Sequence, residues 1–163
     1  PWYAHYTVGS NLRLTELQAA ILLGQLTRLE AQTIKREKNA GILNKRIDSI
    51  PGIHRQPGDP RIIRRSYHLY TIRVDIDELG LSRERFIEAL RAEGIQCGSG
   101  YPRPLYANPL FPKEGITDVS CPNAETLARQ IVWLQHQVLL AEETDVNDIA
   151  NALEKVIEQR ESL

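Results

Sequence analysis

The residues best suited to bind an anion lie immediately before the first expected helix. Asn11 offers an amide group and Arg13 a guanidinium, only two positions apart. An amide N–H can donate a hydrogen bond to a phosphate oxygen near a helix start, and a guanidinium pairs well with a carboxylate. Asn and Arg are also common near helix starts, so the spacing indicates an anion contact without identifying the anion.

A second chemically rich segment is the proline-containing loop at residues 98–109. Tyr101, Arg103 and Tyr106 lie close together in it, among prolines that stiffen the backbone. Aromatic and guanidinium groups contribute strongly to binding in pockets and at interfaces. Two tyrosines and an arginine on a stiff loop are therefore expected to line one or the other.

The remaining residues offer weaker chemistry. The chain has no G-x-G-x-x-G or Walker A pattern, which excludes the usual nucleotide-phosphate loops. Its four histidines show no metal-ligand spacing, so we expect no metal site. Cys97 ends an apolar run, and we interpret it as a packed core residue rather than a nucleophile.

Composition and charge disfavour several classes of partner. The 163 residues include 20 Lys and Arg against 21 Asp and Glu, a net charge of −1 that gives no overall attraction to nucleic acid or anionic membranes. A basic cluster at residues 61–65 precedes Tyr67 and Tyr70, but these rings would point to opposite faces of a strand, which disfavours an RNA-binding surface. No apolar run approaches the ~18 residues of a membrane span. With only two cysteines, we expect reduced thiols and a cytoplasmic protein.

A single long helix is predicted to follow the anion-binding segment. Thr15 and Gln18 form a capping-box pattern, and no proline occurs in residues 12–50. We therefore predict one helix from Thr15 to Asp48, about 50 Å long. Its first half is almost entirely apolar or small and should be buried on more than one side, whereas its second half is charged on most faces. Such a helix is typical of a link between two bodies.

The rest of the chain alternates between strands and helices. The predicted strands lie at residues 66–76, 95–97 and 131–140. The predicted helices begin at the caps Ser82, Asn123 and Thr144. His68 falls within the first strand and is expected to be half-buried and hydrogen-bonded. This order predicts an α+β fold, in which a small three- to four-stranded sheet carries helices on one face and follows the long linking helix.

Several motifs together resemble one enzyme family. The run Gly9-x-Asn11-x-Arg13-Leu14-Thr15-Glu16-Leu17-Gln18-Ala19-Ala20 is similar to the G-x-N-x-R-(M/L)-(S/T)-E-x-Q-A-A segment of the DegT/StrS (DegT/DnrJ/EryC) family of pyridoxal-phosphate sugar aminotransferases. Later landmarks of the family follow in the same order: Tyr67-His68-Leu69-Tyr70, Gly94-Ile95 and Tyr101-Pro102-x-Pro104-Leu105. The loop at residues 100–111 resembles most the scyllo-inosose aminotransferase and aminohydroxybenzoate-synthase branch. The resemblance covers essentially the whole chain.

The resemblance implies that the chain is the C-terminal part of a fold-type I aminotransferase. Residues 1–14 would end the large cofactor-binding domain, residues 15–50 would form the linking and interface helix, and residues 51–163 the small α+β domain. The family's Schiff-base lysine lies upstream, and no lysine here stands in its sequence context. The absence of any Met also indicates a processed or partial chain. We therefore expect pyridoxal phosphate in the full-length parent, and neither catalysis nor cofactor binding by this chain alone.

The resemblance also assigns site residues one by one. Asn11 matches the family asparagine that reaches the cofactor phosphate of the neighbouring subunit in a homodimer. Arg13, His68, Tyr101 and Tyr106 match positions on the substrate side or wall of the site. Tyr106 stands where many nucleotide-sugar enzymes have a histidine. A keto-cyclitol or related keto-sugar, aminated from an amino-acid donor, is therefore the expected substrate.

Two other classes of function stay open at this point. A non-enzymatic α+β module that dimerises through its long helix would explain the apolar first half of that helix. Nucleic-acid binding is the second, and retention on heparin would favour it. A lysine in a Ser/Gly-rich turn upstream would favour the aminotransferase.

Overall fold

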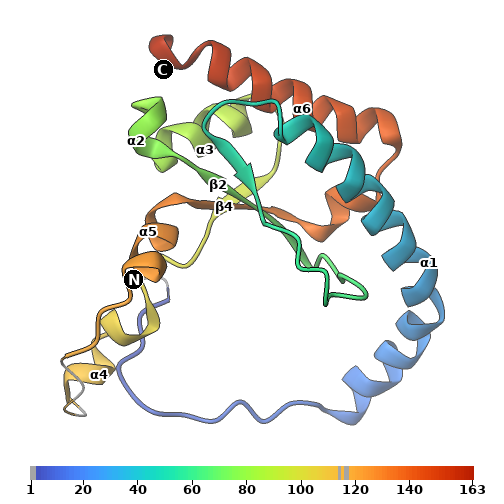
Figure 1. The fold of residues 1–163 in the computed structure, drawn as a ribbon. Coiled ribbons are helices and arrows are strands. Elements are labelled where there is room, and N and C mark those ends of the chain that lie inside the picture. Colours follow the sequence, from blue (N-terminus) through green and yellow to red (C-terminus); the bar gives the residue numbers. More distant parts are fainter. Residues whose placement is uncertain (1–2, 114, 116–117) are drawn as a thin grey trace.

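The computed structural model describes residues 3–113, 115 and 118–163. Within this part, the chain builds a four-stranded antiparallel sheet with strand order β1-β2-β4-β3 (Figure 1). The strands are β1 (Ile53–Arg55), β2 (Leu69–Val74), β3 (Cys97–Ser99) and β4 (Ile131–Gln135). The predicted α+β architecture with a small sheet is confirmed.

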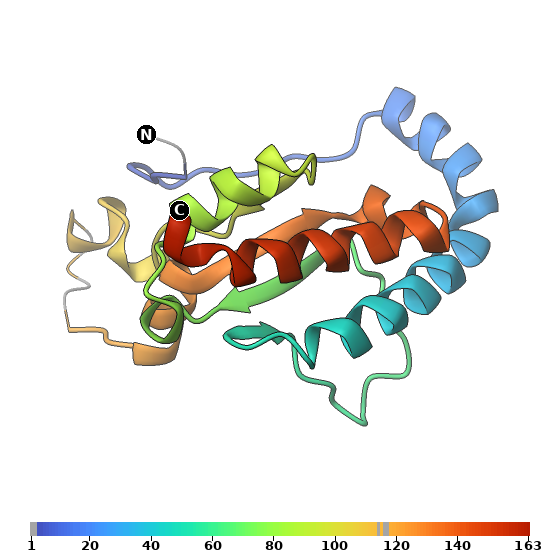
Figure 2. The same ribbon diagram turned by 90° about the horizontal axis from the view of Figure 1, so that it is seen from above.

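One face of the sheet carries the hydrophobic core. Tyr70, Ile72 and Val74 of β2 are buried at alternate positions, and Leu134 and Val132 of β4 lie opposite the first two. Three helices cover this face (Figure 2): α1 (Glu16–Ile47), α3 (Arg83–Ala92) and α6 (Glu143–Glu158). Because neighbouring strand residues point to opposite faces, the intervening residues of β2 and β4 face away from this core.

The long helix forms as the capping pattern predicts. Thr15 is the N-cap of α1, shares a capping box with Gln18, and Asp48 is the C-cap. The half that packs on the rest of the molecule is the second one, with buried residues Thr33, Arg36, Asn39, Ala40, Leu43 and Ile47. The first half projects away from the sheet (Figure 1), and its large apolar side chains are exposed: Leu17, Ile21, Leu22, Leu23, Leu26 and Leu29. The prediction that this apolar half is buried is therefore wrong for this chain alone. None of the described helices combines the length and the apolarity needed to cross a membrane.

Arg36 shows how a charged half of a helix can be buried. Its side chain is 6% exposed, and Nε donates to the carbonyl oxygen of Ser66 at 2.8 Å while Nη2 donates to Thr33 Oγ1 at 2.9 Å. Asn39 Nδ2 likewise donates to the carbonyl oxygen of Leu139 at 2.9 Å. Burial of a polar group costs little when its hydrogen bonds are satisfied. Thr33 lies on the same helix, but Ser66 and Leu139 lie 30 and 100 positions from the residues that bind them, so the helix sequence does not reveal these two partners.

The strand at the centre of the sheet is shorter than predicted. Tyr67 adopts a left-handed backbone with φ 46°, which interrupts the extended chain before β2. His68 therefore precedes the strand and is exposed, and the prediction of a half-buried strand histidine is wrong.

Other element boundaries differ by a few residues. The strand predicted at 95–97 lies at Cys97–Ser99, and the strand predicted at 131–140 ends at Gln135 and continues as a 3-10 helix over His136–Leu140. Ser82 caps α3 as predicted, but α5 (Pro122–Gln130) follows the N-cap Cys121 rather than Asn123, and α6 follows Glu142 rather than Thr144. The sequence did not indicate β1, α2 (Ile76–Leu79) or α4 (Leu110–Lys113), which are too short to show a periodic pattern.

Cys97 lies in the core, as its apolar surroundings predict. It is 8% exposed, and burial raises the pKa of its thiol. Its place in the hydrophobic core confirms the predicted packing role.

Candidate functional site

A hollow of about 760 Å³ opens on the sheet face opposite the core. Its floor consists of Leu69 and Thr71 of β2 and of Ile131 and Trp133 of β4. Thr71 and Trp133 pair directly across the two strands, one position away from the buried Tyr70. The alternation that builds the core therefore also builds this floor.

Two glycines allow the chain to pass close to the floor. A Cβ at Gly98 would lie 2.7 Å from Trp133 Nε1, and one at Gly100 would lie 2.7 Å from Ile131 Cγ2. Any larger residue would displace these side chains. The glycines thus fix where the following loop meets the hollow.

One wall is the loop that the sequence predicts to line a pocket or an interface. Tyr101 and Arg103 border the hollow, which confirms that prediction for these two residues. The Tyr101 ring packs edge-on against Trp133, with centroids 5.5 Å apart, and lies 4.4 Å from the ring of Tyr3. The short helix α5 contributes Ala124, Leu127 and Ala128. Sequence reasoning missed Trp133, for which the alternation within the apolar run at 131–135 was the available signal.

The segment before β2 forms another part of the rim. Arg65, Tyr67 and His68 border the hollow there. A left-handed backbone costs a bulky residue such as Tyr67 on the order of 1–3 kcal/mol. Its ring stacks on Tyr70, with centroids 6.1 Å apart, and Arg36 Nε holds the preceding carbonyl oxygen. The core and α1 therefore brace this rim from behind.

The predicted substrate residues divide between two places. His68 and Tyr101 border the hollow, whereas Tyr106 does not. The Tyr106 hydroxyl donates to Glu125 Oε1 and accepts from the backbone N–H of Cys121 at 3.0 Å. The bond between them raises the pKa of Tyr106 and lowers the pKa of Glu125. These contacts fasten the loop to the start of α5, and a contact between Tyr106 and substrate stays a prediction.

Asn11 and Arg13 lie outside the hollow, on the exposed segment that leads to α1. Arg13 Nε donates to Asn11 Oδ1 at 2.8 Å. This bond occupies the amide oxygen and leaves Nδ2 as a donor, for which the described part of the chain offers no acceptor. The pair therefore presents an amide donor beside a guanidinium, an arrangement that suits an anion.

No lysine side chain among those described borders the hollow. Three lysines on α1 and α6 form ion pairs with glutamates: Lys35 with Glu142 (2.8 Å), Lys38 with Glu143 (3.3 Å) and Lys155 with Glu93 (2.8 Å). These pairs lie on the helical layer, on the other side of the sheet from the hollow.

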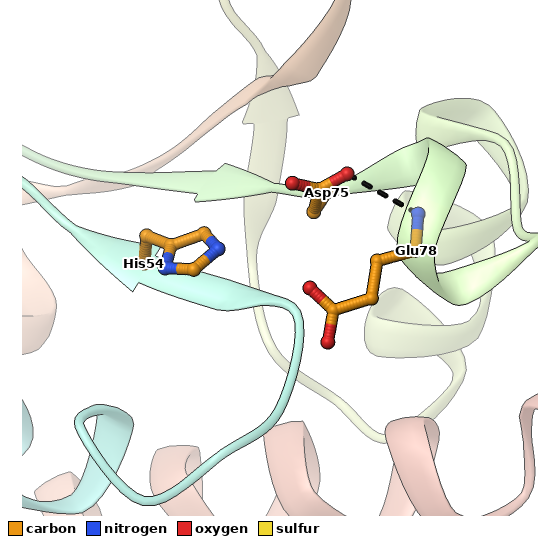
Figure 3. A group of neighbouring side chains, drawn as sticks. All are labelled: His54, Asp75 and Glu78. Carbon is orange, nitrogen blue, oxygen red and sulfur yellow. Dashed lines mark hydrogen bonds between the residues drawn. The ribbon is translucent and has the colours of Figure 1, made fainter.

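A group of three possible metal ligands lies away from the hollow. Atoms of His54, Asp75 and Glu78 approach within 4.8 Å of one another (Figure 3), because β1 pairs with β2. Asp75 Oδ2 already accepts from Arg73 Nη1 at 2.9 Å, and Oδ1 accepts from the Glu78 N–H at 3.2 Å. The bond to the Arg73 guanidinium lowers the pKa of Asp75, and this positive charge opposes a second cation. We therefore do not assign a metal site to His54, Asp75 and Glu78.

Comparison with known proteins bears directly on the anion-binding segment and the loop. A sequence model of the DegT/DnrJ/EryC1/StrS aminotransferase family matches residues 2–154. The chain belongs to this family. The matched range includes Asn11 and Arg13, the rim before β2 and the loop that carries Tyr101. The family resemblance of the sequence motifs is confirmed.

Relatives of this DegT-family chain include enzymes of the branch that its loop resembles. It is 35% identical over 170 residues to an L-glutamine:2-deoxy-scyllo-inosose aminotransferase from Micromonospora echinospora. This alignment covers 96% of this chain and 40% of that protein. It is 32% identical over 161 residues to the 3-amino-5-hydroxybenzoate synthase of Amycolatopsis mediterranei, with 93% and 40% coverage. The predicted branch is confirmed at the level of sequence similarity.

Solved structures of the family share the fold. The crystal structure of 3-amino-5-hydroxybenzoic acid synthase superposes with a TM-score of 0.79 at 30% identity, over 98% of this chain and 43% of that one. DesV from S. venezuelae gives a TM-score of 0.74 at 28% identity, with 97% and 40% coverage. The DegT-family chain therefore spans about two fifths of the length of these relatives, and its likeness to fold-type I aminotransferases is confirmed.

Proposed function

We propose that the chain is the C-terminal part of a pyridoxal-phosphate-dependent aminotransferase that transfers an amino group from an amino-acid donor to a keto-cyclitol or keto-sugar. The observation that carries this proposal is the family match over residues 2–154, together with relatives named for scyllo-inosose and aminohydroxybenzoate. In this proposal, residues 1–14 end the large domain, residues 15–50 link it to residues 51–163, and the protein is a cytoplasmic homodimer.

Asn11, held by Arg13, fits the phosphate group of the proposed cofactor. The hydrogen bond from Arg13 Nε fixes the Asn11 amide so that Nδ2 is the available donor. A neutral amide N–H can donate a hydrogen bond to a phosphate oxygen, and the bond from Arg13 holds the amide in place. We assign Asn11 to the phosphate bound in the neighbouring subunit, and Arg13 to the wall of the substrate site beside it. When bound, pyridoxal phosphate supplies the electron sink for moving the amino group.

The chain alone should be inactive because an amine must hold the cofactor and move a proton. Lys35, Lys38 and Lys155 are ion-paired on the helical layer, as described above. Lys45 lies on the exposed side of α1, and Lys113 lies at the end of α4. The lysine that holds the cofactor is therefore assigned to the portion of the longer protein outside this chain.

The hollow supports a ring-shaped substrate. Trp133 and Tyr101 offer aromatic surface to the apolar face of a ring, while Thr71 and His68 offer polar groups to its hydroxyls. Bound rings of this class are polar at their edges and apolar on their faces, which matches the lining.

The exposed leucines of α1 favour a second candidate, a non-enzymatic module that associates through this helix. An apolar surface of this kind commonly marks an interface. Both candidates include dimerisation, so only the cofactor separates them.

The deciding experiment is the intact mass of the native gene product, compared with that of this chain, and its absorbance at about 330–430 nm before and after borohydride reduction. A product more than twice this mass that carries a reduced-cofactor band supports the aminotransferase. A product of this same mass without such a band supports the module.

Asn11 provides a sharper test in the longer protein. Asn11→Ala should weaken pyridoxal phosphate binding about tenfold or more, because it removes a hydrogen bond to a charged group. Cofactor titration followed by absorbance measures this loss, and Asn123→Ala, an exposed residue of α5, is the matched control. Unchanged affinity in Asn11→Ala would remove Asn11 from the cofactor site.

A further inference from the structure

We propose that Arg65 and Arg103 form a carboxylate-binding subsite of the hollow, which orients a small substrate over the aromatic floor. The inference rests on the proposed function, which offers two sources of a carboxylate: the amino-acid donor, or a ring acceptor that carries its own acid group. The shared chemistry is a planar carboxylate next to an apolar body.

The charge of the hollow is uneven. Its lining includes Arg65, Arg103 and His68, and none of the described lining residues is acidic. The whole chain carries 21 acidic against 20 basic residues, so this imbalance does not follow from composition. A concave surface of one charge sign with apolar walls concentrates ligands of the opposite charge.

Both guanidinium groups keep donors available for a ligand. Arg65 Nη2 donates to the carbonyl oxygen of Pro57 at 2.7 Å, which uses one of the five N–H donors of the group. Arg103 makes no hydrogen bond or ion pair with the described part of the chain. A guanidinium presents two parallel N–H groups that match the two oxygens of a carboxylate.

The rim that carries Arg65 is held in place before any ligand binds. The backbone N–H of Arg65 donates to Glu37 Oε1 of α1 at 3.0 Å, and the adjacent carbonyl oxygen of Ser66 accepts from the buried Arg36 at 2.8 Å. Because Arg65 has its backbone fixed by the buried half of α1, less conformational entropy is lost on binding.

The floor suits the body of such a ligand. Trp133 and Tyr101 meet edge-to-face, and Leu127 and Ile131 complete an apolar surface beside them. An apolar lining with a few polar groups is typical of small-molecule sites, in which the polar groups fix orientation. Here the two arginines would fix the carboxylate and the aromatic rings would contact the ring or methylene chain.

The test measures binding of benzoate and L-glutamine to the 163-residue chain by isothermal titration, with benzamide as the uncharged analogue of benzoate. Arg65→Gln and Arg103→Gln should each weaken benzoate binding about tenfold or more. Arg103→Lys keeps the positive charge but loses the paired N–H groups of the guanidinium. Its affinity for benzoate should therefore fall between those of the unmodified chain and Arg103→Gln. Arg85→Gln, on α3 across the sheet, is the matched control and should change nothing. Circular dichroism melting checks that each variant is folded.

Kinetics of the longer protein distinguish the two sources of the carboxylate. If the arginine-to-glutamine variants of the longer protein raise KM for the amino donor alone, the carboxylate belongs to the donor. If they raise KM for the keto acceptor alone, it belongs to a ring acid. Equal binding of benzamide and benzoate, no benzoate binding by the unmodified chain, or unchanged binding in both glutamine variants would overturn the inference. A longer protein without cofactor would overturn the proposed function instead, while the benzoate result would be unaffected, so the two failures are distinguishable.

Discussion

The two halves of α1 differ in composition and in burial, and the more apolar half is the more exposed one. The first half carries a run of leucines and is exposed, whereas the second half carries most of the charge and contains the buried residues of the helix. Leu22 is 47% exposed and Leu43 is fully buried, although both lie on one continuous helix. The difference teaches that a helix is buried where the rest of the fold supplies a surface, and that apolar composition alone does not supply one.

The comparison is sharpest for the substitution of leucine in each half. Leu43→Ala should lower the free energy of unfolding by about 2–5 kcal/mol, because it leaves a cavity between α1 and the core. Leu22→Ala is the matched control and should change it by less than about 0.5 kcal/mol in this chain. Urea unfolding followed by circular dichroism measures both values. Similar losses in the two variants would show that the first half is also packed.

Arg36 tests whether hydrogen bonding accounts for the burial of a charged half. Arg36→Ala should cost about 1–3 kcal/mol, because the buried Thr33 hydroxyl and the partly buried Ser66 carbonyl bond both lose their guanidinium donor. Arg28→Ala, an exposed arginine of the first half, is the control. The same unfolding measurement applies, and a negligible cost for Arg36→Ala would contradict the bracing of the rim by α1.

The smallest effect concerns the ion pair that joins the second half of α1 to the start of α6. Lys35 Nζ lies 2.8 Å from Glu142 Oε1, and this bond lowers the pKa of Glu142 below its ordinary value. The carboxylate is therefore favoured in the folded state. The pair contributes stability above the ordinary glutamate pKa, and this contribution is lost as the pH falls through the lowered pKa.

Glu142→Gln should therefore lower the melting temperature slightly near neutral pH and not at low pH. Melting curves from about pH 6 down to about pH 3 span the titration of carboxyl groups. A difference between the two proteins that stays constant over this range would show that the ion pair has no part in it.

Local patterns were reliable where they depend on neighbours in sequence. Thr15 with Gln18 caps α1, and Ser82 caps α3, because a cap is completed within three or four residues. The cap of α6 was misplaced because Glu142, a less common N-cap residue, precedes Thr144. The left-handed backbone at Tyr67 had no sequence signal, since glycine is the residue expected there.

The candidate site was predicted only in part. Tyr101 and Arg103 were expected to line a pocket or an interface, because aromatic and guanidinium groups on a stiff loop commonly contribute to binding, and both border the hollow. Trp133 was not singled out, and Arg65 was considered only as part of a basic cluster, because the two positions come near the loop only when the sheet forms. Tyr106 lies in the same loop, yet its hydroxyl is directed to Glu125 and Cys121.

The sequence by itself determined the family, the α+β class and the start and end of α1. Each of these depends on motifs or on short-range periodicity that survive without knowledge of the fold. The tertiary structure alone decided which half of α1 is buried, which loop residues meet the hollow, and which arginines keep free donors. These depend on contacts between residues such as Arg36 and Ser66, or Tyr101 and Trp133, which are 30 or more positions apart. Burial and hydrogen bonding are set by what lies across such a contact, and a linear pattern does not contain that information.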